Sequence, residues 1–161
     1  FVAGDATLIE AFRWLRGYAA TTMPIPIQAA SAALWLDEHH VEANRALYRE
    51  KFELADRILG DRFGYVRPAG GFFLWLDVGD GEAAARALWR EAGLRTLPGA
   101  YLSAPEADGR NPAARYLRVA LVHDAATLHE ALPRLVEVLD RLEGSGAATF
   151  RSAAAATGAT A

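Results

Sequence analysis

The run Phe72-Phe73-Leu74-Trp75-Leu76-Asp77-Val78 constrains the fold of this chain more than any other segment. It is dense in aromatic and aliphatic residues and follows a Pro68-Ala69-Gly70-Gly71 turn signal, which is typical of a strand. Both faces of the strand are apolar, so we expect it to be central, with cover on both sides of its sheet. Together with Tyr65-Val66 before the turn, it is expected to form a hairpin-like unit.

The segments before and after this strand have the apolar periodicity of helices. Apolar residues recur at spacings of three and four, and start and stop signals such as Asp5, Gly17, Gly60 and Gly93 bound the segments. The expected helices cover residues 6–16, 26–37 (with Pro26 in the first turn), 40–59, 81–92 and 125–142, and short strands are expected at 94–97 and 116–122. The four tryptophans lie in apolar patterns and are expected in the core. Helices covering such a sheet make an α/β fold, here of the α+β type.

Composition excludes several classes of function. The 161 residues carry a formal charge of −3, which argues against nucleic acid or an anionic membrane as a partner. Cysteine is absent, which excludes disulfides, thiolate metal sites and cysteine nucleophiles and suits the cytoplasm. No apolar run is long enough to span a bilayer, and no signal peptide is visible.

The two ends of the sequence suggest how it is organised. The chain opens without Met, on Phe1-Val2-Ala3-Gly4-Asp5, and we expect it to be a piece of a longer protein. Residues 144–161 are almost wholly Ala, Gly, Ser and Thr, and this composition predicts a disordered tail.

Arg118 is the strongest candidate for a functional side chain. It lies in the strand Tyr116-Leu117-Arg118-Val119-Ala120-Leu121-Val122, where an arginine keeps its charge and needs an anion. The planar guanidinium matches a carboxylate with two parallel hydrogen bonds. Two other interpretations stay open from the residues alone: a salt bridge to an internal Asp or Glu, and an exposed position at a sheet edge.

The other polar residues complete no known catalytic pattern. His39-His40, with Glu38 and Glu42 nearby, lacks a metal-binding motif and is interpreted as a solvated helix start, so no metal is expected. Neither Gly70-Gly71 nor Pro98-Gly99 belongs to a phosphate-binding loop, and no serine lies in a nucleophile elbow. The residues by themselves therefore predict one anion site and no catalytic centre.

Six motifs in order nevertheless resemble the C-terminal half of class I/II pyridoxal-phosphate-dependent aminotransferases. They cover nearly everything from Phe1 to Leu142. The motifs are Phe1-Val2-Ala3-Gly4-Asp5, Pro26-Ile27-Gln28-Ala29-Ala30-Ser31, Asp37-Glu38-His39-His40-Val41-Glu42-Ala43-Asn44-Arg45, Gly70-Gly71-Phe72-Phe73-Leu74-Trp75, Leu97-Pro98-Gly99-Ala100-Tyr101-Leu102, and Asn111-Pro112 followed by Tyr116-Leu117-Arg118-Val119-Ala120-Leu121-Val122. The residues of two of these motifs, Gln28-Ala29-Ala30-Ser31 and Asn111-Pro112, are most similar to those of the N-succinyldiaminopimelate aminotransferases.

The resemblance implies a domain organisation. Members of this family are fold type I homodimers with a large cofactor-binding domain, a long linking helix and a small C-terminal domain. Residues 1–38 would be a remnant of the large domain. Residues 39–143 would be the linking helix and the small domain, whose sheet is covered by helices, and residues 144–161 would be the tail.

The resemblance also implies roles for particular residues. Arg118 matches the arginine that binds the substrate α-carboxylate, and Thr21 and Thr22 are weaker candidates for contact with the neighbouring subunit's cofactor. The cofactor would be pyridoxal 5'-phosphate. The Schiff-base lysine is expected upstream of Phe1, because the single lysine, Lys51, does not match its motif. No catalytic residue is therefore expected within this chain.

The implied activity of the parent protein is amino-group transfer from glutamate to an N-succinyl-2-amino-6-oxopimelate-type keto acid, in lysine biosynthesis. One alternative is another acceptor, as in aspartate, aromatic or alanine aminotransferases, or a lyase on the same fold. A second alternative is that the chain is a truncated, non-catalytic module that only folds or dimerises. Its exposed apolar residues, among them Leu8, Phe12 and Leu15, would then favour association.

Overall fold

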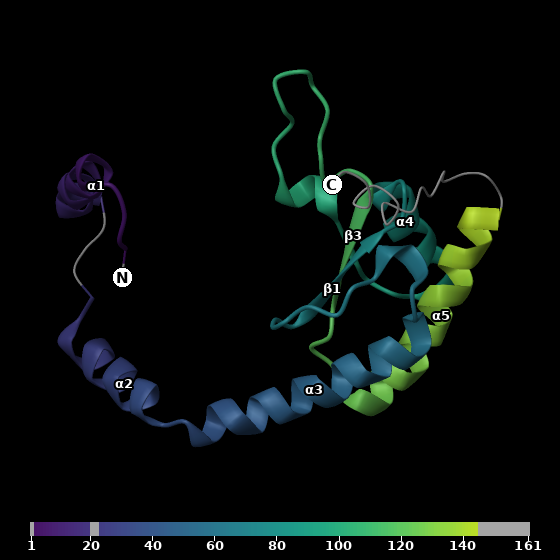
Figure 1. Ribbon diagram of the computed structural model, residues 1–161, viewed down its shortest axis with the longest axis horizontal. Coiled ribbons are helices and arrows are strands. Elements are labelled where there is room, and N and C mark those ends of the chain that lie inside the picture. Colours follow the sequence, from purple (N-terminus) through teal and green to yellow (C-terminus); the bar gives the residue numbers. More distant parts are fainter. Residues whose placement is uncertain (1, 20–22, 145–161) are drawn as a thin grey trace, which may run out of the picture. The chain divides into compact units, whose positions relative to one another are not determined.

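The computed structural model describes residues 2–19 and 23–144 (Figure 1). Contacts within the chain divide it into two compact units, Phe1–Ala43 and Asn44–Ala161. The division falls inside helix α3 (His39–Leu59). The predicted tail, apart from Gly144 at the end of the last helix, lies outside the described residues, as do Thr21 and Thr22.

The first unit consists of helices α1 (Ala6–Ala19) and α2 (Ile25–Leu36), neither of which buries a residue. Asp5 caps α1 as predicted, since its carboxylate accepts hydrogen bonds from the backbone of Thr7 and Leu8. The predicted stop at Gly17 is wrong: a glycine inside a helix lowers its stability but does not by itself end it. Helix α2 begins directly after Pro24 and has Pro26 in its first turn, a position that proline tolerates.

Helix α3 has the length that its apolar periodicity predicts. Asp37, two residues before the helix, accepts a hydrogen bond from the first helical amide, His39 N, at 3.0 Å. The helix ends before Gly60, whose φ of 60° is a left-handed conformation that glycine adopts at little cost. The second half of α3 is amphipathic and buries Phe52, Leu54, Ala55 and Leu59 in the core of the second unit.

The second unit contains an antiparallel sheet in the order β1-β3-β2, formed by β1 (Phe73–Asp77), β2 (Leu97–Pro98) and β3 (Tyr116–Ala120). Strand β1 is therefore an edge strand among the described residues, and the prediction that it is central and covered on both faces is wrong. The hairpin is wrong too, because Tyr65 and Val66 form no strand and β1 pairs with β3. An apolar second face does not require a covering helix.

Helices α4 (Gly81–Ala92) and α5 (Ala125–Gly144) lie on one side of the sheet (Figure 1). Asp80 caps α4, and Gly93 ends it with φ near 64°. Helix α5 runs through Pro133 as one element. The apolar periodicity of α5 forms a buried face, since Leu128, Leu132, Leu135 and Leu139 are buried in one core with Leu74, Leu76 and Leu117 of the sheet.

The arrangement confirms the predicted α/β class, a small sheet covered by helices. The expectation for the tryptophans is wrong. Their exposed fractions range from 37% for Trp75 to 84% for Trp35, with Trp14 and Trp89 in between. Apolar periodicity locates an apolar face but not what covers it. Within residues 2–19 and 23–144, no helix combines the length and hydropathy that a bilayer crossing requires.

Candidate functional site

The open face of the sheet carries Arg118. Strand β3 is the middle strand, and its register places Arg118 between Trp75 of β1 and Leu97 of β2. Side chains alternate across a strand, so Leu117 and Val119 point into the core while Arg118 points to the other face. Strand β3 lies within the strand predicted over residues 116–122.

Two aromatic rings hold the Arg118 side chain. Its guanidinium carbon lies 4.5 Å from the ring centroid of Phe73 and 5.5 Å from that of Phe72, both within cation–π range. The two rings meet edge to face, with centroids 5.4 Å apart. Sequence reasoning missed this role of Phe72 and Phe73, because the β1–β3 register is what puts Phe73 and Arg118 on one face.

Arg118 lacks an internal anion. Within the described residues no carboxylate lies within ion-pair distance of it, and its buried Nε has no hydrogen-bond partner. Arg115, three residues earlier, is different: its Nε donates to Asp77 Oδ1 at 2.7 Å, and this bond raises the arginine's pKa. Asp77 is thus already engaged by Arg115, whereas Arg118 is available for an external carboxylate.

A second aromatic pair borders Arg118 on the same face. Trp75 and Tyr116 stack with centroids 5.4 Å apart and planes inclined by 16°. Gly99 lies beneath this stack, where a Cβ would come within 3.0 Å of the Trp75 ring and run into the carbonyl oxygen of Ala113. The close approach explains why a glycine follows Pro98 in this motif.

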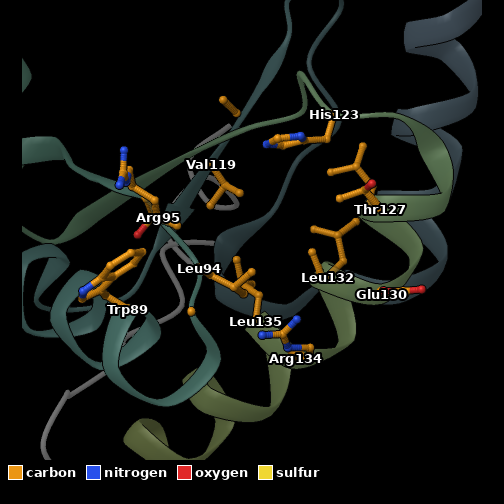
Figure 2. Close-up of a pocket in the computed structure, with 15 residues that line it drawn as sticks. Trp89, Leu94, Arg95, Val119, His123, Thr127, Glu130, Leu132, Arg134 and Leu135 are labelled. Atoms are coloured by element: carbon orange, nitrogen blue, oxygen red, sulfur yellow. The ribbon is translucent and has the colours of Figure 1, made fainter.

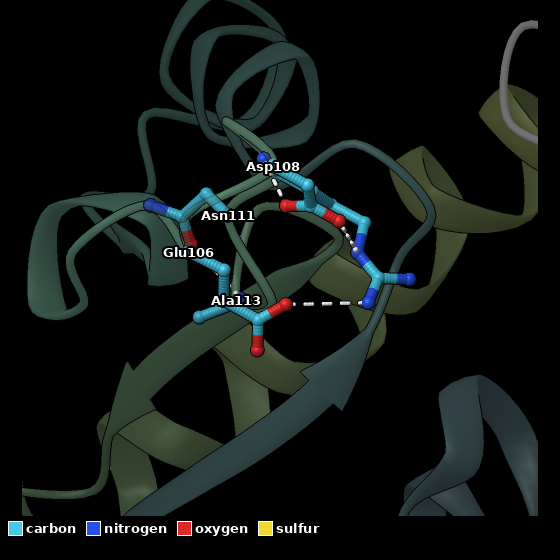
Figure 3. A network of polar contacts seen from close by, with 5 residues as sticks. Glu106, Asp108, Asn111 and Ala113 are labelled. Carbon is cyan, nitrogen blue, oxygen red and sulfur yellow. Dashed lines mark hydrogen bonds and ion pairs between the residues drawn. The ribbon is translucent and has the colours of Figure 1, made fainter.

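Asn111 joins the two loops next to this face. Its side-chain amide donates to the carbonyl oxygens of Ala100 (3.2 Å) and Ser103 (3.1 Å), and its Oδ1 accepts from Ala113 N at 2.9 Å. Figure 3 shows Asn111 and Ala113 near Glu106 and Asp108, which belong to an exposed ion-pair cluster with Arg110. The motifs at residues 97–102 and 111–112 are therefore coupled through Asn111, which fixes the chain just before β3.

The helix-covered side of the sheet has a pocket of its own. It is half-open, measures about 470 Å³ and lies between the end of α4 and the start of α5. Figure 2 shows Trp89 and Arg95 on one side of it and His123 and Thr127 on the other. Val119 and Ala120 at the end of β3 line this pocket and Arg118 does not, so the pocket is separate from the candidate carboxylate site.

The remaining candidates lie elsewhere. His40 Nδ1 lies 3.1 Å from Asp37 Oδ2, and this contact, with the backbone bond from His39, lowers the pKa of Asp37. Within the part of the chain that the structure describes, no three metal-ligating side chains cluster. Thr21 and Thr22 cannot be placed, since they lie outside the described residues.

Lys51 does not suit the role of a cofactor anchor. It is 8% exposed, and its Nζ donates to the carbonyl oxygen of Leu121 at 2.9 Å. The amine also lies 4.6 Å from the centroid of the Tyr48 ring. Because Lys51 is the single lysine of the sequence, the chain has no accessible side-chain amine for covalent attachment of an aldehyde cofactor. Its residues match a carboxylate ligand, not the cofactor's covalent site.

Comparison with known proteins agrees with this geometry. The chain is 44% identical to an aminotransferase from Neisseria meningitidis Z2491 (TM-score 0.72, covering 85% of this chain and 35% of that one). It is 34% identical to aminotransferase AspB from Helicobacter pylori 26695 (TM-score 0.68, covering 86% and 35%). Over 100 residues it is 32% identical to 4-dedimethylamino-4-oxo-anhydrotetracycline transaminase OxyQ of Streptomyces rimosus, a match that covers 62% of this chain and 28% of OxyQ.

The chain spans about a third of the length of these relatives. Residues 1–135 match the family described as aminotransferase class I and II, whose enzymes depend on pyridoxal phosphate. This match covers most of the chain and includes both β3 and Arg118. The chain therefore belongs to the class I and II aminotransferase family.

Proposed function

We propose that this chain supplies the substrate-binding part of an aminotransferase and that Arg118 binds the α-carboxylate of the amino acid. The observation that carries the proposal is the difference between two arginines of one segment. Arg115 is paired with Asp77, whereas Arg118 faces outward between two rings without a carboxylate among the described residues. A half-buried guanidinium without a counter-ion is costly unless a ligand supplies one.

Binding in this way would orient the substrate. A carboxylate accepts two parallel hydrogen bonds from a guanidinium, which fixes its plane as well as its position. Since Phe72 and Phe73 restrict the guanidinium, the bound amino acid would present its Cα at a constant place relative to the sheet. The family's cofactor supplies the electron sink for the chemistry at that carbon.

The domain organisation belongs to the same proposal. Residues 1–38 would come from the large cofactor-binding domain, and residues 39–143 would form the linking helix and the small domain. The parent protein would be a cytoplasmic homodimer with its cofactor-binding lysine upstream, and Thr21 and Thr22 would approach the cofactor of the neighbouring subunit. Two observations support this division. Lys51 is hydrogen-bonded to Leu121 O, and this chain covers only 35% of the length of its relative from Neisseria meningitidis.

The proposed reaction moves the amino group of glutamate to an N-succinyl-2-amino-6-oxopimelate-type acceptor. Two motifs support this choice, Gln28-Ala29-Ala30-Ser31 and Asn111-Pro112. A structural relative, LysN of Thermus thermophilus, is an α-aminoadipate aminotransferase at 25% identity (TM-score 0.64), and α-aminoadipate is also a dicarboxylic amino acid. A panel of keto acids assayed with the full-length protein separates this acceptor from oxaloacetate, pyruvate and aromatic keto acids.

The test of the carboxylate site is Arg118→Ala in the full-length protein. Truncating one member of a buried charge pair costs about 2 to 5 kcal/mol, so the KM for glutamate should rise on the order of 30-fold or more. The matched control is Arg86→Ala on α4, which removes an exposed pair with Glu82 and should leave KM unchanged. A wild-type KM in Arg118→Ala would refute the assignment.

A second candidate function concerns the chain on its own. With its single lysine buried and hydrogen-bonded, the chain alone would act as a non-catalytic folding or dimerisation module. Catalysis would then require the segment that carries the cofactor's lysine.

A further inference from the structure

Lys51 is buried without an evident reason in the fold. It is the one buried charged side chain within the described residues. Its Nζ makes one hydrogen bond, to Leu121 O, and lies 4.6 Å from the centroid of the Tyr48 ring, while no carboxylate of the described chain lies within ion-pair distance. Burying an ammonium group this way costs free energy, and an apolar side chain of similar size would fill the space without that cost. Stability alone therefore does not account for this lysine.

The partner of Lys51 lies at a particular place in the sheet. Leu121 directly follows β3, and its N–H donates to Phe72 O at 2.8 Å, just before β1 begins. Lys51 thus binds the carbonyl of the residue whose amide holds Phe72. The bond links α3 to the end of the sheet where β1 starts and β3 stops.

That end of the sheet also carries the aromatic support of Arg118. The ring of Phe72 lies 5.5 Å from the guanidinium carbon and contacts the closer ring, Phe73, edge to face. A displacement of Leu121 would move Phe72 through the hydrogen bond between them. Lys51, Leu121, Phe72 and Arg118 therefore form a continuous series of contacts from the helix to the candidate carboxylate site.

We propose that Lys51 is a positioning residue for carboxylate recognition, which holds the start of β1 and the end of β3 so that Phe72 and Phe73 orient Arg118. The inference rests on the proposed function, because it assigns Lys51 to the same site. Lys51 touches neither substrate nor cofactor in this role. Its effect should therefore appear in the binding of carboxylates and should depend on Arg118.

The experiment is a double-mutant cycle in the full-length protein, with Lys51→Met, Arg118→Ala and the two combined. The readouts are KM and kcat for glutamate and the inhibition constant of succinate, a dicarboxylate without an amino group. Lys51→Met should raise KM and the inhibition constant about tenfold, the effect of losing one charged hydrogen bond, and change kcat by less than about twofold. In the Arg118→Ala background it should change neither binding constant further.

The control is Arg49→Met, which removes an exposed basic side chain from the same helix and should leave all three values unchanged. If Lys51→Met yields too little folded protein, Lys51→Gln replaces it with the same expectation, since its side chain is one atom shorter and its amide carries no charge. Equal effects of the Lys51 variant in both backgrounds, or no effect in either, would overturn the inference. If Arg118→Ala itself has no effect, the proposed function fails instead.

Discussion

Tyr65 makes the stability of the second unit depend on pH. Its buried hydroxyl donates to Asp56 Oδ1 at 2.6 Å, and Arg67 binds the other carboxylate oxygen at 2.7 Å. Burial, followed by the bond to Asp56, raises the pKa of Tyr65 far above its usual value of about 10. The folded state therefore keeps this proton after the unfolded state has lost it, and the resulting stability is complete below about pH 10 and is lost at higher pH.

We therefore expect Tyr65→Phe to reduce the alkaline loss of stability. At pH 7 the variant should be less stable by about 1 kcal/mol, the value of one hydrogen bond. Between about pH 9 and 11 its melting temperature should fall less steeply than that of the wild type. Tyr101→Phe, at an exposed tyrosine, is the control and should follow the wild-type curve. Parallel curves for wild type and Tyr65→Phe would contradict the prediction.

Single residues differ in how far the sequence predicts their roles. The face occupied by Arg118 follows from strand alternation alone, which is a local property of the chain. That Asp77 pairs with Arg115 depends on the β1–β3 register, which alternation does not determine. The hydrogen bond from Lys51 to Leu121 joins residues that are 70 positions apart, so no local sequence pattern predicts it.

At the scale of elements, the start of α4 is fixed by its contact with β3. Gly81 N donates to Ala114 O at 2.9 Å, and a Cβ at Gly81 would run into the carbonyl of Tyr116. Gly81→Ala should therefore destabilise the protein by about 1 to 3 kcal/mol, although alanine is the better helix former. Urea denaturation followed by circular dichroism measures the change.

Gly17→Ala is the matched control for this substitution. Gly17 lies inside α1 with nothing within 4 Å of an added Cβ, so helix propensity acts there alone. Gly17→Ala should therefore stabilise α1 by up to about 1 kcal/mol, and the helical circular dichroism signal should rise. Similar behaviour of the two alanine variants would show that the contact with Tyr116 does not restrict Gly81.

The sequence predicts some elements better than others. The caps at Asp5, Asp80 and Gly93 are local hydrogen-bonding patterns, and they locate helix ends well. For strand β1 the sequence predicts the position correctly and the environment wrongly. An apolar outer face can be covered by a helix or left for a ligand or another part of a protein, and the strand's own residues do not distinguish these cases.

At the scale of the whole chain, the first unit leaves much apolar surface exposed. Helices α1 and α2 bury no residue, and Leu8, Phe12 and Leu15 are all exposed. Contiguous apolar surface of this kind promotes association in water. The purified chain should therefore associate as its concentration rises, as measured by analytical ultracentrifugation.

Replacing Phe12 and Leu15 by Glu should weaken this association, because charged groups resist desolvation at a contact. Arg16→Glu is the control, since it changes the charge of the same helix without removing apolar surface. A wild-type chain that stays monomeric at every concentration, or a double variant that associates as strongly, would contradict the expectation.

The purified chain should not bind an aldehyde cofactor covalently through a side chain. An aldehyde cofactor attaches to an accessible, deprotonated amine, and the only side-chain amine here is buried and donates to Leu121 O. Pyridoxal phosphate mixed with the purified chain should therefore give no absorbance band that shifts when glutamate is added. Lys51→Met is the matched control and should give the same spectrum. A glutamate-sensitive band in the wild type that disappears in Lys51→Met would show that Lys51 leaves its site, and the chain would then contain a competent amine of its own.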